Sequence, residues 1–316
     1  MLRSSLYALP FLILYGLRKY VESKWGKCKN KIKLDGKVVI ITGANSGIGL
    51  AVAEELAARN ATVIFACRDL RSAELAIERI RKIKSSANLI PMELDLASLK
   101  SIDNFVIKFK RQFDSLDILI NNAGVSQQTK RELTKDNLEI HFGVNYLGHF
   151  YLTNSLLDIL EKSRPSKVII VSSKLHEKGH IHLDDLNSVT QSSKSLYSNS
   201  KLANVFFCQE LARRTLNKGI DIFAVCPGWV YTNLFRHYIK WYHYVLLSPI
   251  AFFFMRSAKQ GAQTIVYCAT EPGLQTGIIY RDCRMYESKY EFDPVVSTQL
   301  WTKSEEIIEK IKEQPH

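Results

Sequence analysis

A glycine-rich turn that directly follows an apolar run is the feature that most constrains this chain. Residues 38–42 read VVIIT, and the turn continues as Gly43-Ala44-Asn45-Ser46-Gly47-Ile48-Gly49. A strand that enters such a turn and then opens a helix can bind a dinucleotide pyrophosphate, because helix N–H groups and the helix dipole attract anions. We expect Gly43 to form the tight turn, Gly47 to admit a phosphate and Gly49 to pack the helix against the strand.

The rest of the chain alternates between strand-like and helix-like segments. Apolar runs predict strands at 38–42, 62–66, 89–94, 117–121, 167–172 and 220–226, and apolar periodicity predicts helices at 47–59, 71–84, 99–113, 138–160 and 195–217. This alternation implies right-handed crossovers and an α/β, Rossmann-type fold, a doubly wound parallel sheet with helices on both faces. Ligands of such sheets lie beyond the carboxyl ends of the strands. The 316 residues contain no linker-like stretch in the middle, so we expect one large domain.

The N-terminal segment is the second unusual feature. Ser4–Leu17 contains fourteen residues without a charge. As a helix it would span about 21 Å, which is short of a hydrocarbon core of about 30 Å, and Pro10 would kink it. A secretory signal peptide is the alternative, but no small-x-small cleavage site follows. We therefore predict an uncleaved membrane anchor at 1–17, which either spans or only inserts.

Positive charge is concentrated just after this segment. Residues 18–37 hold eight Lys or Arg residues against Glu22 and Asp35, so half of the net charge of +12 lies there. A basic chain can bind nucleic acid, but this clustering beside an apolar segment favours anionic lipid headgroups, and we predict no nucleic-acid partner. The positive-inside bias then places a basic linker at 18–35 and a domain at 36–316 on the cytoplasmic side.

The ends of the second and third predicted strands suggest which nucleotide is bound. The second strand ends at Cys67-Arg68-Asp69. An Arg at this place suits a ribose 2′-phosphate, so we predict a preference for NADP(H), although Asp69 could instead accept from the 2′-hydroxyl of NAD(H). Asp95 follows the third strand and can accept from the adenine amine, with a helix N-cap as the alternative.

Four residues after the fourth and fifth predicted strands suggest proton-transfer chemistry. Tyr197 and Lys201 lie four apart and so share one face of a helix. We expect the ammonium to lower the pKa of the phenol, which would let Tyr197 act as general acid or base. Ser173 is chosen over Ser172 to orient a substrate carbonyl. Asn145, a poor helix former inside a predicted helix, would hold a water that feeds protons to Lys201, with exposure to solvent as the alternative.

These motifs together resemble the short-chain dehydrogenase/reductase family over about residues 36–285. The resemblance rests on TGANSGIG at 42–49, Asp95, NNAG at 121–124, Asn145, Ser173, YSNSK at 197–201, and Pro227-Gly228 with Thr232. It implies Asn145, Ser173, Tyr197 and Lys201 as catalytic residues. It also implies nucleotide contacts from Gly43, Asn45, Ser46, Gly47, Ile48, Gly49, Arg68, Asp95, Asn122, Tyr197, Lys201, Pro227, Val230 and Thr232. Asn121 and Gly124 would border the cofactor.

Three shorter stretches are similar to the retinol dehydrogenase-like branch of that family, namely CRD at 67–69, HFGVNYLGHF at 141–150 and VSSKLH at 171–176. The resemblance implies a membrane-associated enzyme that interconverts a hydrophobic alcohol and its aldehyde or ketone, at the endoplasmic reticulum membrane or a lipid droplet and facing the cytosol. The alternatives are a hydroxysteroid dehydrogenase and a non-catalytic cofactor-binding scaffold. Members of the family also suggest a homodimer that pairs through the helices around 138–160 and 195–217.

An aromatic and basic segment lies between Thr232 and a helix that we expect to begin near Ser257. Such a segment can be core or a nucleic-acid surface. In this fold it covers the substrate pocket, and residues 238–256 are apolar enough that we predict a second contact with the membrane.

The remaining features predict structure rather than chemistry. The six cysteines lack C-x-x-C spacing, which indicates reduced thiols in a reducing compartment. No acid or Cys completes a ligand set with His176, His180 and His182, so no metal site is predicted. Thr302 with Glu305 resembles a capping box that opens a short C-terminal helix.

Overall fold

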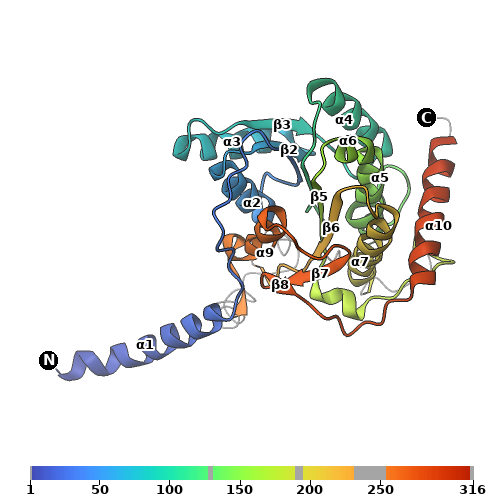
Figure 1. Ribbon diagram of the computed structural model, residues 1–316. Coiled ribbons are helices and arrows are strands. Elements are labelled where there is room, and N and C mark those ends of the chain that lie inside the picture. The colour runs from blue at the N-terminus through green and yellow to red at the C-terminus, as the bar shows by residue number, and fades with distance from the viewer. Residues whose placement is uncertain (1, 127–130, 189–194, 231–253, 314–316) are drawn as a thin grey trace.

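The apolar runs of the sequence form the strands of one sheet. The computed structural model describes residues 2–126, 131–188, 195–230 and 254–313. Within these residues the sheet has eight strands in the order β3-β2-β1-β4-β5-β6-β7-β8, and only the pair β7 and β8 is antiparallel (Figure 1). The strands are β1 (Val38–Thr42), β2 (Thr62–Cys67), β3 (Leu89–Glu93), β4 (Ile118–Asn121), β5 (Ser166–Val171), β6 (Ile220–Val225), β7 (Ile278–Arg281) and β8 (Arg284–Met285).

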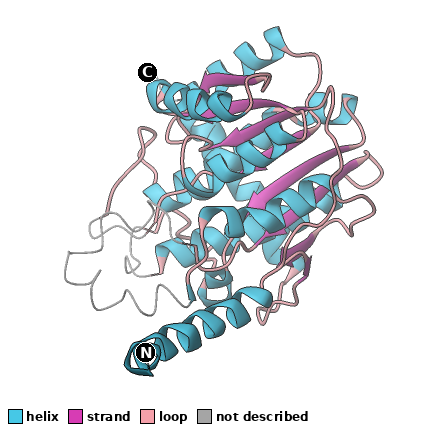
Figure 2. Cartoon of the chain, turned by 90° about the vertical axis from the view of Figure 1, so that its left-hand side faces the viewer, coloured by secondary structure: helices cyan, strands magenta, loops and turns pink. Residues whose placement is uncertain are grey.

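Helices cover both faces of this sheet, as Figure 2 shows. The first face carries α2 (Gly47–Ala58), α3 (Leu70–Ile83) and α9 (Ala258–Thr270). The second carries α4 (Leu99–Gln112), η1 (His141–Leu147), α5 (Gly148–Ser155), α6 (Leu157–Lys162), α7 (Leu196–Arg214) and α10 (Pro294–Glu313). Side chains alternate along β1, so Val39 and Ile41 enter the first core while Val38 and Ile40 enter the second. The doubly wound Rossmann-type fold is confirmed, and all six cysteines are free.

One long predicted helix is divided in the structure. The segment predicted as a helix over 138–160 begins as the π-helix η1, continues as α5 and restarts as α6. The break falls at Leu156, whose φ of −110° and ψ of 3° leave the helical region. Hydrophobic periodicity cannot distinguish these pieces, because a wider turn and a one-residue break keep the same buried face.

The N-terminal helix α1 (Leu2–Ser23) runs unbroken through Pro10, where a kink was expected. It extends away from the domain in Figure 1. In the parts of the chain that the structure describes, no helix combines the length and apolarity needed to cross a bilayer.

The residues after α1 are hydrogen-bonded to the domain, although they were expected to be a linker up to residue 35. The Asn30 side chain donates to Glu271 Oε2 at 2.6 Å and accepts from Arg59 Nη1 at 2.7 Å. Gly26 N donates to Asp282 Oδ1 at 3.2 Å. Part of the basic segment therefore belongs to the folded body.

The C-terminal helix α10 corrects the predicted capping box. It begins at Pro294, eight residues before Thr302, and Thr302 Oγ1 donates to the carbonyl of Thr298 within the helix. Asp293 caps the helix instead, since its Oδ1 accepts from Val295 N at 2.8 Å, and Pro294 stands at the first helical position, where its missing N–H costs nothing. The Ser/Thr-x-x-Glu pattern also fits the middle of a helix, so it misplaced the start.

We expect Asp293→Ala to lower the free energy of unfolding by about 1 kcal/mol, because the first turn of α10 loses a side-chain acceptor. Thr302→Ala should change it by less than about 0.5 kcal/mol, because this exposed residue lies within the helix. Urea unfolding of both variants makes the comparison. A larger loss for Thr302→Ala than for Asp293→Ala would contradict this assignment of the cap.

Candidate active site

The turn between β1 and α2 has the backbone geometry that its glycines predicted. Gly43 and Gly47 adopt φ values of +66° and +56°, in the left-handed region where a Cβ is unfavourable. A Cβ on Gly49 would lie 2.4 Å from the carbonyl oxygen of Gly43. Gly49 therefore permits close packing as expected, although its neighbour is the turn itself rather than the strand.

The first turn of α2 is suited to an anion. Its N-cap residue is Ser46, whose side chain makes no capping hydrogen bond, so the backbone N–H groups of the first turn lack that partner. Asn45 and Ile48 flank it and are half-buried. Burial raises the pKa of the nearby Cys67 thiol to about 11, so this side chain brings no negative charge to the turn at neutral pH. The cradle fits a dinucleotide pyrophosphate.

The two residues predicted to contact the ribose, Arg68 and Asp69, follow β2 and differ in their surroundings. Arg68 is exposed. Asp69 caps α3, because its carboxylate accepts from Ser72 N at 3.1 Å and from Ser72 Oγ at 2.5 Å. Arg68 is therefore the more available of the two for a ligand.

Asp95 lies buried beyond β3. It accepts from Ala97 N at 3.1 Å and pairs with Lys135 Nζ at 2.9 Å. Ser98, not Asp95, is the N-cap of α4, so the capping alternative for Asp95 is wrong. Arg68, Asp95 and Lys135 line one open hollow at this edge of the sheet.

Tyr197, Lys201 and Ser173 come together at the carboxyl end of β5. Lys201 is buried in α7, where its Nζ donates to the carbonyl of Val171 at 3.0 Å and lies 5.7 Å from the centroid of the Tyr197 ring. Ser173 lies close enough to the Tyr197 hydroxyl to favour the ionised phenol. Ser172 Oγ instead donates to the backbone carbonyl of Lys201 at 2.7 Å. Of the two serines, Ser173 is therefore the one that interacts with the phenol, and its role toward a substrate carbonyl stays a prediction.

The expected direction of the phenol pKa is wrong. Burial raises the pKa of Tyr197 to about 12, and Ser173 only partly opposes this. Burial also lowers the pKa of Lys201 to about 8. The prediction considered the neighbouring charge and neglected the loss of water, which disfavours both ionised forms.

Asn145 is fully buried in η1, so the solvent-exposed alternative is wrong. Its Oδ1 accepts from Val125 N at 2.7 Å, and its Nδ2 donates to Val125 O at 3.1 Å and to Ser200 Oγ at 3.0 Å. A Cβ added to Gly124 would lie 3.1 Å from Asn145 Oδ1 and 3.6 Å from Lys201 Nζ. Gly124, in the segment after β4, thus lies close to both of these side chains.

The ends of β4 and β6 hold the other predicted nucleotide contacts. The Asn122 side chain donates to the carbonyl of Thr42 at 2.9 Å, beside the glycine turn. The carbonyl of Pro227 accepts from Arg256 at 3.2 Å, and Val230 pairs with the backbone of Arg256. Asn121 is buried in β4. Thr232 and residues 238–253 of the predicted membrane contact lie outside the described residues.

Two polar side chains beside the site, His141 and Glu139, were missed from the sequence. His141 lies edge-on to Tyr197 with ring centroids 6.3 Å apart. Its Nδ1 is 2.6 Å from Glu139 Oε1, and its Nε2 is 2.9 Å from the carbonyl of Ser126. A signal was available, because His141, Asn145 and His149 recur every four residues in an otherwise apolar helical stretch.

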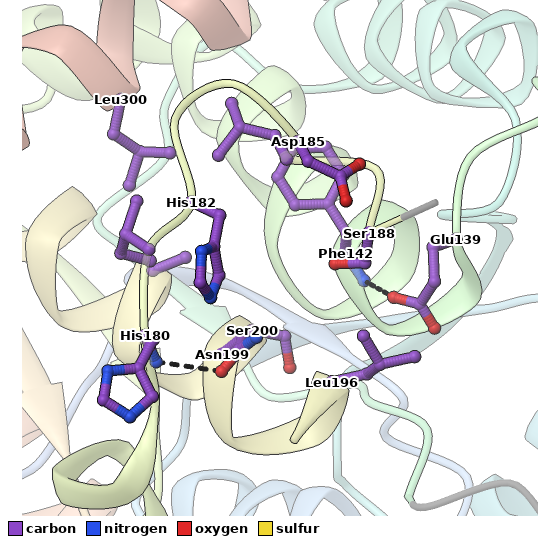
Figure 3. Close-up of a pocket in the computed structure, with 13 residues that line it drawn as sticks. Glu139, Phe142, His180, His182, Asp185, Ser188, Leu196, Asn199, Ser200 and Leu300 are labelled. Atoms are coloured by element: carbon purple, nitrogen blue, oxygen red, sulfur yellow. Dashed lines mark hydrogen bonds between the residues drawn. The ribbon is translucent and has the colours of Figure 1, made fainter. Parts of the chain in front are cut away.

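A narrow pocket adjoins the start of α7 (Figure 3). Phe142, Leu196 and Leu300 supply apolar walls, and His180 and His182 line it from the loop before α7. His176 lies apart from them, with its Nε2 2.7 Å from Ser288 Oγ. In the described part of the chain, no group of three or more His, Cys, Asp or Glu residues is arranged to hold a metal ion.

Comparisons with known proteins agree with this geometry. A family model described as short chain dehydrogenase matches residues 37–243. Retinol dehydrogenase 11 of Homo sapiens is 38% identical over 312 residues, which cover 96% of each protein, and retinol dehydrogenase 14 of Homo sapiens is 41% identical over 297 residues, or 88% of each. A solved structure of an uncharacterized protein from Mycobacterium paratuberculosis is 32% identical, with a TM-score of 0.68 over 88% of this chain and 95% of that one.

The burial of Lys201 gives a stability prediction for the protein without nucleotide. Lys201→Met should raise the free energy of unfolding at pH 7 by about 2 kcal/mol, because the folded wild type keeps an ammonium out of water. Between pH 8 and pH 10.5 the folded wild type loses this proton before the unfolded chain does. The free energy of unfolding of the wild type therefore rises with pH in that range, and the difference between the wild type and Lys201→Met should shrink.

Urea unfolding at pH 7 and at pH 10 measures both effects. Asn204 Nδ2 also donates to the carbonyl of Val171, so the substitution leaves that oxygen with a donor. A wild type more stable than the variant at pH 7 would contradict the prediction.

Proposed function

The chain belongs to the short-chain dehydrogenase family, and we propose that it interconverts a hydrophobic alcohol and its aldehyde or ketone by hydride transfer with NADP(H). The position of Lys201, buried with its Nζ 5.7 Å from the centroid of the Tyr197 ring, is the observation that carries this proposal. A non-catalytic scaffold would have no need to bury an ammonium beside a phenol, so we favour an enzyme over that alternative.

The protein's part in the reaction follows from the protonation states. When bound, the dinucleotide gives hydride to a carbonyl carbon or takes hydride from an alcohol carbon. In reduction, Tyr197 donates its proton to the carbonyl oxygen, and its raised pKa keeps the proton in place until then. Ser173 holds that oxygen by a hydrogen bond as negative charge develops on it. Lys201 stabilises the phenolate that remains, and Asn145 supports the return of a proton to Lys201.

Tyr197→Phe tests this mechanism most directly. The ring keeps its packing but loses the group that moves the proton, so kcat should fall about 10²–10⁴-fold while the free energy of unfolding changes little. Membranes containing either protein can be assayed with retinal, a polyprenal and a ketosteroid, each with NADH and NADPH. Equal turnover by both proteins, or none by either, would remove the proposed mechanism.

Arg68 supports the preference for NADP(H) over NAD(H). The neighbouring acid, Asp69, is engaged in capping α3, so the exposed guanidinium is the group available for a 2′-phosphate. A guanidinium matches the geometry of a phosphate with paired hydrogen bonds. Lys135 lines the same hollow, where its ammonium pairs with Asp95.

Arg68→Ser should raise the KM for NADPH about tenfold and leave the KM for NADH nearly unchanged, because only the phosphate contact is lost. Arg79→Ser, at an exposed arginine of α3 eleven residues further along the chain, is the matched control. Steady-state kinetics with both nucleotides decide the matter. An equal rise for both nucleotides would assign Arg68 to the shared part of the dinucleotide.

We place the substrate among membrane lipids, a retinoid or another isoprenoid alcohol rather than a hydroxysteroid. The relatives above are named retinol dehydrogenases, and α1 exposes apolar side chains at Ile13, Leu14 and Leu17. Phe254, at the end of the predicted second membrane contact over 238–256, is 57% exposed. These features suit attachment to the cytosolic face of the endoplasmic reticulum or a lipid droplet.

Deleting residues 1–17 tests the two-contact attachment. The full-length protein should float with liposomes that contain anionic lipid, and the deletion should weaken this binding without abolishing it, because 238–256 still reaches the bilayer. A fully soluble deletion variant would exclude the second contact. A full-length protein that does not float would exclude the anchor as well.

A further inference from the structure

His149 is a buried side chain to which neither the sequence motifs nor the mechanism assigns a role. It lies in α5 with no exposed surface. Its Nε2 is 2.9 Å from Thr42 Oγ1, and its Nδ1 is 3.2 Å from the main-chain oxygen of Asn145. The ring therefore stands between the strand that enters the glycine turn and the helix that carries Asn145.

The hydrogen bonds around Thr42 fix the tautomer of this ring. Thr42 Oγ1 accepts from the backbone N–H groups of Asn122 and Ala123, each at 2.9 Å. A hydroxyl has two acceptor positions and one donor, so only its proton remains. The nearer acceptor for it is His149 Nε2 at 2.9 Å, because the carbonyl of Ile120 is 3.4 Å away.

His149 Nε2 is therefore unprotonated, and Nδ1 carries the hydrogen that is donated to the Asn145 carbonyl. The ring is also neutral at physiological pH. Burial lowers the pKa of His149 to about 3, and the positive charge of Lys201 acts in the same direction.

This ring joins two parts of the site that are far apart in the sequence. Thr42 immediately precedes Gly43 of the nucleotide-binding turn, and its carbonyl accepts from the Asn122 side chain. Asn145 holds Val125 through both backbone groups, next to the Gly124 position that faces Lys201 Nζ. A hydrogen-bonded path thus runs from the turn through Thr42 and His149 to Asn145.

We propose that His149 is a positioning residue, a neutral imidazole with its proton on Nδ1 that holds the Asn145 carbonyl in a fixed place relative to the nucleotide-binding turn. The consequence for catalysis rests on the proposed function, because it assumes that Asn145 supports proton return to Lys201. The tautomer and the two hydrogen bonds do not depend on that assumption.

Two variants test separately the two hydrogen bonds of the His149 bridge, which are the bond from Thr42 to Nε2 and the bond from Nδ1 to the carbonyl of Asn145. His149→Asn keeps a donor near the Nδ1 position, and His149→Gln keeps an acceptor near the Nε2 position. We expect His149→Gln to lower kcat about tenfold, since the carbonyl of Asn145 loses a buried donor, with the Kd for NADPH changed less than about threefold. His149→Asn should recover most of the lost kcat. Equal kcat values for the two variants, or a loss confined to nucleotide Kd, would overturn the positioning role.

A measurement on the wild-type protein covers the case in which neither variant folds. The ¹⁵N spectrum of protein labelled at histidine reports which ring nitrogen is protonated. For a ring that does not titrate between pH 5.5 and pH 8.5, we expect a protonated Nδ1 and an unprotonated Nε2. If every non-titrating ring carries its hydrogen on Nε2, or if all rings titrate in this range, the bridge is refuted.

Failure of the proposed mechanism and failure of the His149 proposal give different results. Active Tyr197→Phe protein would refute the proposed mechanism and leave the His149 tautomer standing. An Nε2–H tautomer would refute the bridge and leave the mechanism standing.

Discussion

The site depends on the hydrogen bond that the buried ammonium of Lys201 donates to the backbone. Its hydrogen bond to the carbonyl of Val171 ties α7 to the end of β5 and holds the charge beside Tyr197. Because burial disfavours charge on both groups, the pKa of Lys201 is lowered and that of Tyr197 is raised. At neutral pH the phenol of Tyr197 therefore keeps its proton.

Much of the fold follows from short-range patterns. The first six strands were found within one or two residues, because strands covered on both faces are nearly continuous apolar runs. The tight turn at Gly43 was also predictable, since positive φ values restrict the residue type. The hairpin of β7 and β8 was missed, because β8 is a two-residue exposed strand whose pairing depends on β7 being placed beside β6 first.

The candidate site was predictable where chemistry requires a fixed spacing in the sequence, as for Tyr197 and Lys201. The properties of its side chains that depend on burial were less predictable. The sequence shows that an amine lies one helical turn from a phenol, but it does not show how much water both lose. Asn145 illustrates the same limit. Its place inside a helical stretch signalled a role, but the π-helical turn that directs it at Val125 depends on packing against the segment after β4. His149 was missed because a buried histidine in an apolar helix resembles ordinary core.

The docking of the segment after α1 has a practical consequence for preparing the protein. The guanidinium groups of Arg18 and Arg256 lie 4.7 and 5.0 Å from the centroid of the Trp25 ring, and Arg256 in turn donates to the carbonyl of Pro227. A shortened protein that begins at residue 36 would lose these contacts and expose the residues of α9 that the segment covers, among them Gln263 and Thr270. A cut ahead of Arg18 would retain these contacts, and with them the surroundings of Arg256, which holds the carbonyl of Pro227 just after β6.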